Sequence, residues 1–318
     1  MTDMKRIVFS FFIVTGLLLL ISCRQKNPDK LTDTPTSGSI KIGVDETLAP
    51  IIRSEIEVFE SIYYTSKIED IPCPEVDAFN LLLKDSVRMI IATRTLNDKE
   101  TEYFKSVKIY PKEVKIAVDG IALIVHKENR DTMLTTGVIK DILTGKIKTW
   151  NQVNPESKPD SIKVIFDNPK SSTAEFAVKS ICNNQPLSSG LSALNNNRDV
   201  IDFVAKTPNA LGIIGVNWIS NKRDTTCMGF LDKIKVIAVS KEDIATEANS
   251  FQPYQAYLAN GQYAFTRDVY VILADPRIGL TSGFTSFLTS DRGQRIILKS
   301  GILPVTQPVR IIQVNDEL

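Results

Sequence analysis

Segments with the pattern of strands and of helices alternate along the chain from Ser39 onward. Residues 40–44 form a short apolar run typical of a strand. After Pro50, which can open a helix because its missing N–H needs no partner there, apolar residues recur at helical spacing. Further strands are expected at residues 87–92, 114–125, 162–166, 212–216, 234–239 and 269–274, with helices from Thr135 or Thr136 to near Gly145 and from about 286 to 299, the last closing at Gly301. The alternation predicts an α/β protein with mostly parallel sheets.

Length and charge narrow the function classes. A chain of 318 residues is long enough for about two domains. Its 38 basic and 37 acidic residues give a net charge of +1, which argues against a nucleic-acid partner bound through a basic surface. The single histidine, His126, excludes a zinc site built on several imidazoles, and any Ser-His-Asp mechanism would have to use it. His126 is expected at the surface. The composition favours binding over catalysis, and no metal or cofactor is expected.

The first residues have the pattern of an export signal. Lys5 and Arg6 precede an apolar run from Ile7 to Ile21, which is short for a membrane span and typical of a secretory signal. The run ends in Leu20-Ile21-Ser22-Cys23, which resembles the box of bacterial lipoproteins, in which the cysteine is lipidated. Residues 1–22 are therefore predicted to be a signal peptide and Cys23 the lipid-bearing residue. The alternative is an N-terminal anchor helix with an incidental cysteine.

The stretch behind Cys23 is too polar to pack. Residues 23–38 are predicted to be a flexible tether. Removing residues 1–22 would leave no net charge on the mature chain. Three cysteines would remain, Cys73, Cys182 and Cys227, which match no metal motif and allow at most one disulfide. They are interpreted as small buried residues.

The most distinctive segment is VDGIALIVHKENRDTMLTTGVIKDILTGKIKTWN, residues 118–151. It resembles the phosphate-binding (PstS-like) proteins of bacterial ABC transporters, in which a strand with Asp-Gly-Ile-Ala precedes a helix and a Thr-Gly-Lys-Ile…Trp element. Four further segments agree with that family in order: residues 43–50 (GVDETLAP), 171–173 (SST), 210–216 (ALGIIGV) and 283–304. The resemblance covers nearly all of residues 39–305.

The resemblance implies a two-lobed periplasmic-binding-protein-like fold of type II, with the ligand in a cleft between the lobes. Lobe 1 would comprise residues 39–119 plus 266–318, and lobe 2 residues 120–265. The crossing segments near Asp119-Gly120 and at residues 265–269 would be the hinges for closure.

Two loops can present N–H groups and hydroxyls to an anion. One is the turn that contains Thr47 and Leu48, ahead of the helix that Pro50 opens. The other contains Ser171, Ser172 and Thr173 and follows a strand. The resemblance implies that both loops bind phosphate. The alternative is that these residues are ordinary helix caps, which Ser and Thr favour without any ligand.

Two charged positions depart from the family pattern. The family has Ala-Ser-Asp where this chain has Ala92-Thr93-Arg94, and it has Arg at the start of the serine loop, where this chain has Asp167. The family's Asp accepts the proton of monohydrogen phosphate, and its Arg supplies a cation. The hypothesis is that Arg94 and Asp167 have exchanged these roles, with Thr93 adding a hydroxyl. The alternative is a surface ion pair, or two residues that do not meet.

The function that the resemblance implies is capture of inorganic phosphate by a lipid-anchored receptor. Such a receptor performs no reaction and delivers its ligand to the permease and ATPase subunits of an ABC importer. It is expected to be a monomer, held to a membrane through Cys23 and facing the periplasm or the exterior. The alternatives are a receptor or sensor for another oxyanion and, with less support, an exported phosphatase-like enzyme, for which the chain offers no metal-ligand cluster.

Overall fold

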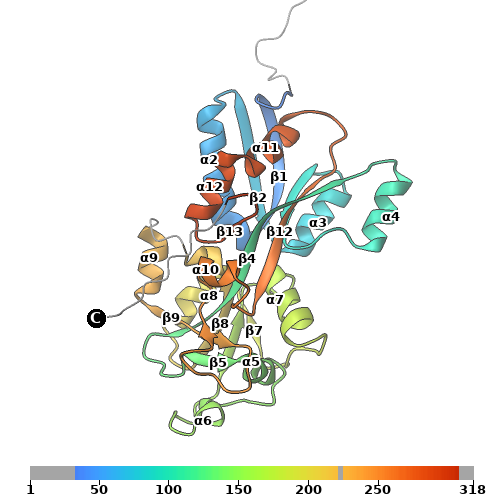
Figure 1. Cartoon of the computed structure of the whole chain (residues 1–318). Coiled ribbons are helices and arrows are strands. Elements are labelled where there is room, and N and C mark those ends of the chain that lie inside the picture. The colour runs from blue at the N-terminus through green and yellow to red at the C-terminus, as the bar shows by residue number, and fades with distance from the viewer. Residues whose placement is uncertain (1–32, 221–224, 308–318) are drawn as a thin grey trace, which may run out of the picture.

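The computed structural model describes residues 33–220 and 225–307, with the side chains of residues 225–227 left out. Figure 1 shows two α/β halves, one above the other, with the long strands β4 and β12 passing between them. The predicted signal peptide, Cys23 and most of the predicted tether lie outside the described residues. Within the described part, no helix has both the length and the apolar character needed to cross a bilayer.

The upper half is built on a mixed sheet in the order β2-β1-β3-β12-β4, with β13 paired to β4. β1 lies parallel to β2 and β3, whereas β12 runs antiparallel to both β3 and β4. The strands are β1 (Gly38–Asp45), β2 (Ser66–Cys73), β3 (Met89–Ala92), β4 (Lys112–His126), β12 (Thr266–Leu273) and β13 (Leu303–Pro304). The helices are α2 (Ala49–Ile62), α3 (Glu75–Leu83), α4 (Asp98–Ser106), α11 (Leu280–Thr289) and α12 (Asp291–Lys299).

The lower half continues from the far end of β4. There β4 pairs antiparallel with β8 and β9, and β8 is followed by β6 and β7 in parallel. The strands of this sheet are β6 (Lys163–Phe166), β7 (Ser192–Ala193), β8 (Ala210–Gly215) and β9 (Ile234–Val236), and a small second sheet contains β5 (Met133–Thr135), β10 (Ala238–Ser240) and β11 (Ser250–Phe251). The helices are α5 (Thr136–Leu143), α6 (Trp150–Val153), α7 (Ser172–Phe176), α8 (Asn197–Val204), α9 (Thr225–Leu231) and α10 (Gln255–Ala259).

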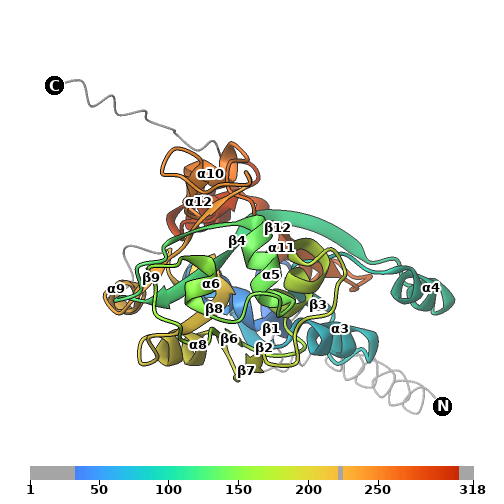
Figure 2. The same cartoon turned by 90° about the horizontal axis from the view of Figure 1, so that it is seen from below.

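The described part also contains three short helical turns. Two are 3₁₀ turns, η1 (Glu46–Leu48) and η3 (Val216–Trp218), and the third is a π-helical turn, η2 (Ala177–Ile181), that continues α7. Figure 2 shows α10 beside α12, where the Gln255 side chain donates hydrogen bonds to the carbonyls of Leu298 and Ile302. Helix α4 lies on the other side of the molecule (Figure 2).

The α/β fold class is confirmed, with one change to the sheets. The sheets are mixed rather than mostly parallel, because β4 and β12 run in opposite directions through the centre and their neighbours pair with them antiparallel. Where the two strands pass between the halves, Asp119 lies opposite Arg267 and Gly120 opposite Thr266. A Cβ on Gly120 would stand 3.0 Å from the Val216 side chain, so this crossing is tightly packed.

Three local predictions need correction. The helix expected over residues 286–299 is two helices, α11 and α12, because Ser290 has an extended backbone and caps α12 with its side chain. The strand expected at 234–239 is interrupted between β9 and β10. His126, the last residue of β4, is buried rather than at the surface, with 9% of the residue exposed.

Other local predictions are confirmed. Thr135 caps α5 by accepting a hydrogen bond from Val138 N, and Gly301 follows α12 with a positive φ of 86°. The expected burial of the cysteines holds for Cys182, whereas Cys73 is only half-buried; both are free thiols, and the side chain of Cys227 lies outside the described part.

Candidate functional site

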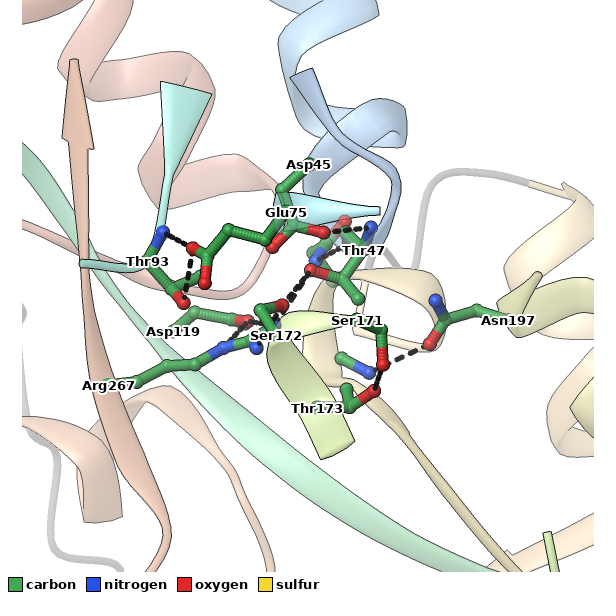
Figure 3. Close-up of polar contacts among 12 residues, drawn as sticks. Asp45, Thr47, Glu75, Thr93, Asp119, Ser171, Ser172, Thr173, Asn197 and Arg267 are labelled. Atoms are coloured by element: carbon green, nitrogen blue, oxygen red, sulfur yellow. Dashed lines mark hydrogen bonds and ion pairs between the residues drawn. The ribbon is translucent and has the colours of Figure 1, made fainter. Parts of the chain in front are cut away.

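The guanidinium of Arg267 is the centre of a buried polar cluster between the two halves. On β12, Arg267 donates from Nε and Nη2 to Oδ2 of Asp119 on β4, over 3.1 and 2.9 Å. Its Nη1 donates to Ser172 Oγ at 2.7 Å and its Nη2 to Thr47 Oγ1 at 2.9 Å. Figure 3 shows these four side chains pointing toward one another from different elements. The site therefore has a buried cation that is held by a carboxylate and directed at two hydroxyls.

The first hydroxyl belongs to the turn after β1. Asp45 ends β1, and its side chain accepts a hydrogen bond from Thr47 N, which fixes η1. Asn217, from η3 in the lower half, donates to the Thr47 carbonyl at 2.6 Å. Thr47 Oγ1 lies 3.2 Å from Ser172 Oγ, so the two halves touch directly at this point. Leu48 is fully buried in the core, which leaves only its backbone for any ligand contact.

The second hydroxyl belongs to the loop between β6 and α7. Ser171 caps α7 by accepting from Ala174 N, which is the ordinary role that Ser favours at this position. The hydroxyls of Ser171 and Thr173 both donate to Oδ1 of Asp167. Ser172 is the first residue of α7, and its hydroxyl instead faces Thr47 and Arg267. Two hydroxyls of this loop therefore bind Asp167, and the third binds the guanidinium of Arg267.

Asn197 connects the serine loop to the upper half. It is fully buried at the start of α8, and its side-chain oxygen accepts from Gly215 N. Its Nδ2 donates to Oδ2 of Asp167 at 3.2 Å and to Oε2 of Glu46 at 2.6 Å. Because Glu46 belongs to η1, this amide bridges carboxylates from both halves of the molecule.

Glu75 places a further carboxylate beside Arg267. It is the first residue of α3 and only 1% exposed. Its Oε1 accepts from both the backbone N and the hydroxyl of Thr93, which follows β3. Glu75, Thr93, Ser172 and Arg267 line one groove of about 490 Å³.

Arg94 also lines this groove, but its guanidinium is bound elsewhere. Its two terminal nitrogens donate to the two carboxylate oxygens of Glu100 over 2.8 and 2.9 Å, and it stacks over the ring of Phe79. Glu100 also accepts from Asn97 N in the capping box of α4. Among the described residues, Arg94 has no hydrogen bond or ion pair with Asp167.

Burial changes the acid strength of the carboxyl groups around Arg267. Burial raises the pKa of Asp45, of Asp119 and of Asp167 above the ordinary value, although the hydrogen bonds of each group oppose the rise. Burial also raises the pKa of Glu75 to about 7, with the charge of Asp45 adding to it. The pKa of Glu46 is raised to about 7 by the same cause. The site therefore has more acidic groups than basic ones, and two of them, Glu46 and Glu75, can hold a proton near neutral pH.

The structure brings together some of the predicted site residues and separates others. Thr47 and Ser172 both accept hydrogen bonds from Arg267. Thr93 lines the same groove and donates a hydrogen bond to Glu75. Ser171 and Thr173 face Asp167, whereas Arg94 faces Glu100. Seven residues of the cluster were missing from the sequence-based set of ligand-binding residues: Asp45, Glu46, Glu75, Asp119, Asn197, Asn217 and Arg267. In the described part of the chain, no group of three or more His, Cys, Asp or Glu side chains has an arrangement that would hold a metal ion.

Known proteins with a similar sequence or structure have the two-part α/β fold described above. A family model described as a PBP superfamily domain matches residues 31–292. The chain is 25% identical over 286 residues to a phosphate-binding protein PstS of Staphylococcus epidermidis, covering 89% of this chain and 84% of that protein.

Two solved structures illustrate the likeness. A phosphate ABC transporter substrate-binding protein of Clostridium perfringens, described as putative and crystallised with phosphate, aligns with a TM-score of 0.69 at 23% identity, over 84% of this chain and 100% of that one. An ABC-type phosphate transport receptor of Vibrio cholerae aligns with a TM-score of 0.63 at 19% identity, over the same shares. Since the family model spans most of the sequence and both structures share the fold, the chain belongs to the periplasmic-binding-protein (PBP) superfamily.

Proposed function

We propose that this protein captures inorganic phosphate and delivers it to an ABC importer, without performing a reaction. The observation that carries the proposal is the guanidinium of Arg267, which is buried between two loops and hydrogen-bonded to one hydroxyl from each. The names of the relatives, phosphate-binding proteins and transport receptors, support the same ligand.

The hydrogen bonds of Arg267 suit a tetrahedral oxyanion. A guanidinium presents its N–H groups in a planar fork that matches two oxygens of a phosphate. On binding, the Nη1 and Nη2 donors would turn from Ser172 and Thr47 to the anion, and the two hydroxyls would donate to its other oxygens. Asp119 would stay behind the guanidinium and fix its orientation, since Nε and Nη2 both bond to it.

A protonated form of phosphate fits the acidic surroundings. A buried carboxylate accepts a hydrogen bond from a phosphate O–H, whereas it repels sulfate, which has no proton at neutral pH. We assign this role to Glu75, because it lines the groove beside Arg267 and only its Oε1 is bonded to Thr93. The exchange of roles between Arg94 and Asp167 stays a prediction, with less support, because Glu100 holds Arg94, and Ser171, Thr173 and Asn197 surround Asp167.

The division into lobes follows the crossing strands. Lobe 1 would comprise residues 39–119 plus 266–318 and lobe 2 residues 120–265, with closure about the Asp119-Gly120 and 265–269 segments. The register supports this boundary, since β4 pairs with β12 up to Gly120 and with β8 from Ile121 onward.

The remaining parts of the proposal concern the cell envelope. A lipid on Cys23 would tether the receptor to a membrane, facing the periplasm or the exterior, within reach of the permease subunits. The ATPase subunit would drive transport from the other side. The receptor would act as a monomer and without nucleic acid.

Calorimetric titration of the purified protein tests the ligand. Phosphate and its close analogue arsenate should bind, while sulfate and molybdate should bind at least roughly a hundredfold more weakly, a difference of about 2.7 kcal/mol. Thermal unfolding gives an independent readout, because a ligand at about 100 times its Kd stabilises the native state by about 2.7 kcal/mol. Absence of phosphate binding in both measurements would refute the proposal.

A further inference from the structure

A second cavity has walls from both halves and lies apart from the candidate ligand site. Its volume is about 1020 Å³, at the upper end of the range of roughly 300–1,000 Å³ typical of sites for small molecules. No described residue lines both this cavity and the groove beside Arg267. We call it the α12 pocket, and its walls include Leu231, Lys235, Val236 and Ala256 of the lower half and Leu298 and Lys299 at the end of α12.

Two contacts between the halves border the α12 pocket. The hydroxyl of Ser220, in the lower half, donates to the carbonyl of Ser300. A Cβ on Gly301 would lie 2.7 Å from the Cβ of Ser220, so the backbone of the upper half approaches this serine closely. On α10, Gln255 donates to the carbonyl of Leu298 at 2.9 Å. The pocket is therefore bordered by packed and hydrogen-bonded contacts between the halves.

The lining of the α12 pocket combines apolar walls with positive charge. Leu231, Val236 and Leu298 are partly buried there, whereas Lys235 and Lys299 are exposed. The described lining contains no acidic residue. Such a surface is complementary to an occupant that has apolar side chains and a negative charge.

The last residues of the chain, 308–318, lie outside the described residues and have this composition. Four of the residues of PVRIIQVNDEL are apolar and β-branched, those at positions 309, 311, 312 and 314. Asp316 and Glu317 outnumber Arg310, so the side chains carry a net charge of 1 − 2 = −1. Contiguous apolar surface is usually covered in a soluble monomer. This segment therefore suits a pocket with apolar walls and lysines.

The segment starts close enough to reach the α12 pocket. Gln307, the residue before it, donates from its side chain to Asp291 at the first turn of α12, over 2.6 Å. From Asp291 to Lys299 the helix advances by about 12 Å, at about 1.5 Å for each residue. The segment has 318 − 307 = 11 residues, which can span up to about 36 Å when extended.

We propose that residues 308–318 occupy the α12 pocket of their own chain, with their apolar side chains against Leu231, Val236 and Leu298. The acidic end of the segment lies near Lys235 and Lys299. Because the pocket has walls from both halves, the docked segment joins the lower half to the end of α12. The groove of the candidate ligand site stays free, so the inference does not depend on which anion binds there.

Amide hydrogen exchange of the full chain, followed by mass spectrometry, tests this placement. The exchange of residues 311–314 is compared with that of a synthetic peptide of sequence 308–318. Two variants alter the pocket: Ala256→Trp fills it, and Lys235→Glu/Lys299→Glu reverses its charge. The matched controls are Ser286→Trp on α11 and Lys99→Glu on α4, two exposed positions that do not line the pocket. Circular dichroism checks the fold of every variant.

In the wild type, residues 311–314 should exchange roughly tenfold or more slowly than in the free peptide, an energy of about 1.4 kcal/mol. Ala256→Trp should abolish this protection and the charge reversal should reduce it roughly threefold or more, while both controls retain it.

Exchange of the wild-type segment at the rate of the free peptide would overturn the inference. So would full protection in a folded Ala256→Trp variant, because the segment would then bind elsewhere. Protection that disappears on dilution would also overturn it, since the segment would then come from a second copy of the chain.

Discussion

Arg267 and Asp119 face each other on neighbouring crossing strands, joined by two hydrogen bonds of 2.9 and 3.1 Å, with side chains 4% and 0% exposed. The pair lies where the chain passes between the two halves, and the same guanidinium contacts one hydroxyl from each half. A single ion pair thereby connects the crossing strands to the candidate ligand site. Its removal should affect both stability and binding.

Replacing Arg267 by Ala should destabilise the protein by about 3–5 kcal/mol, because Asp119 would be left buried without its partner. Phosphate affinity should fall roughly a hundredfold or more, since two charge-assisted hydrogen bonds are lost. Denaturant unfolding and calorimetry measure the two effects.

The double variant Arg267→Ala/Asp119→Ala separates the effect on stability from the effect on phosphate binding. It should recover stability without recovering binding, because the unpaired charge is gone while the anion still lacks its cation. Arg53→Ala serves as the control, since Arg53 is an exposed arginine in an ion pair with Asp70. Full phosphate affinity in the double variant would show that Arg267 has no part in recognition.

Glu75→Gln should reduce the preference for phosphate over sulfate. The amide oxygen can still accept from Thr93, so the local structure should persist. The variant lacks the charge that favours a phosphate O–H and repels sulfate, and the preference should fall roughly tenfold or more. Competition between the two anions at pH 8, above the pKa of about 7 to which burial raises Glu75, measures this, and an unchanged preference would exclude Glu75 as the proton acceptor.

Glu46 should make closure depend on pH. Burial between the two halves raises its pKa to about 7, with Asp167 and Asp45 as the nearby acids and Asn197 as its hydrogen-bond donor. A pKa that is higher in the closed state than in an open, solvated one means that closure takes up a proton. The closed state is then favoured at low pH and loses this advantage as the pH rises through 7.

The comparison of wild type with Glu46→Gln isolates this effect, because the titration of phosphate itself is common to both. From pH 6 to 8 the phosphate affinity of the wild type should fall roughly tenfold relative to that of the variant. Glu57→Gln on the exposed face of α2 should follow the wild type. Parallel profiles for wild type and Glu46→Gln would show that this contact does not bias closure.

Arg94→Ala should act on stability more than on binding. Glu100 would lose both hydrogen bonds from the guanidinium, at a cost of about 1–3 kcal/mol. Phosphate affinity should stay within about threefold, an energy below about 0.7 kcal/mol. A loss of affinity as large as that of Arg267→Ala would instead favour the exchange of roles between Arg94 and Asp167.

Helices and strands were predicted well from the sequence where local apolar spacing or a local cap determines them. The strand 114–125 and the helix capped at Thr135 depend on local apolar spacing and a local cap, and both are present as β4 and α5. Ser290 was missed because the apolar residues on both sides of it were interpreted as one helix, although Thr289-Ser290-Asp291 is a run of residues that favour the start of a new helix.

The site was harder to predict because its key contacts join residues far apart in the sequence. Arg267 precedes an apolar strand like many solvent-exposed arginines, and only the register of β12 against β4 places it opposite Asp119, 148 residues earlier. Glu75 has the sequence pattern of an ordinary acidic residue in the first turn of a helix. Arg94 was assigned to the site from the resemblance alone, and Glu100, six residues later, binds its guanidinium.

A crystal structure of the protein with phosphate tests the position of the ligand most directly. The anion should lie between the two halves, with oxygens within hydrogen-bonding distance of the Arg267 guanidinium and of the hydroxyls of Thr47 and Ser172, and with Glu75 against one oxygen. Phosphate bound at Arg94 and Asp167, without contact to Arg267, would contradict the assignment of Arg267 as the cation of the site.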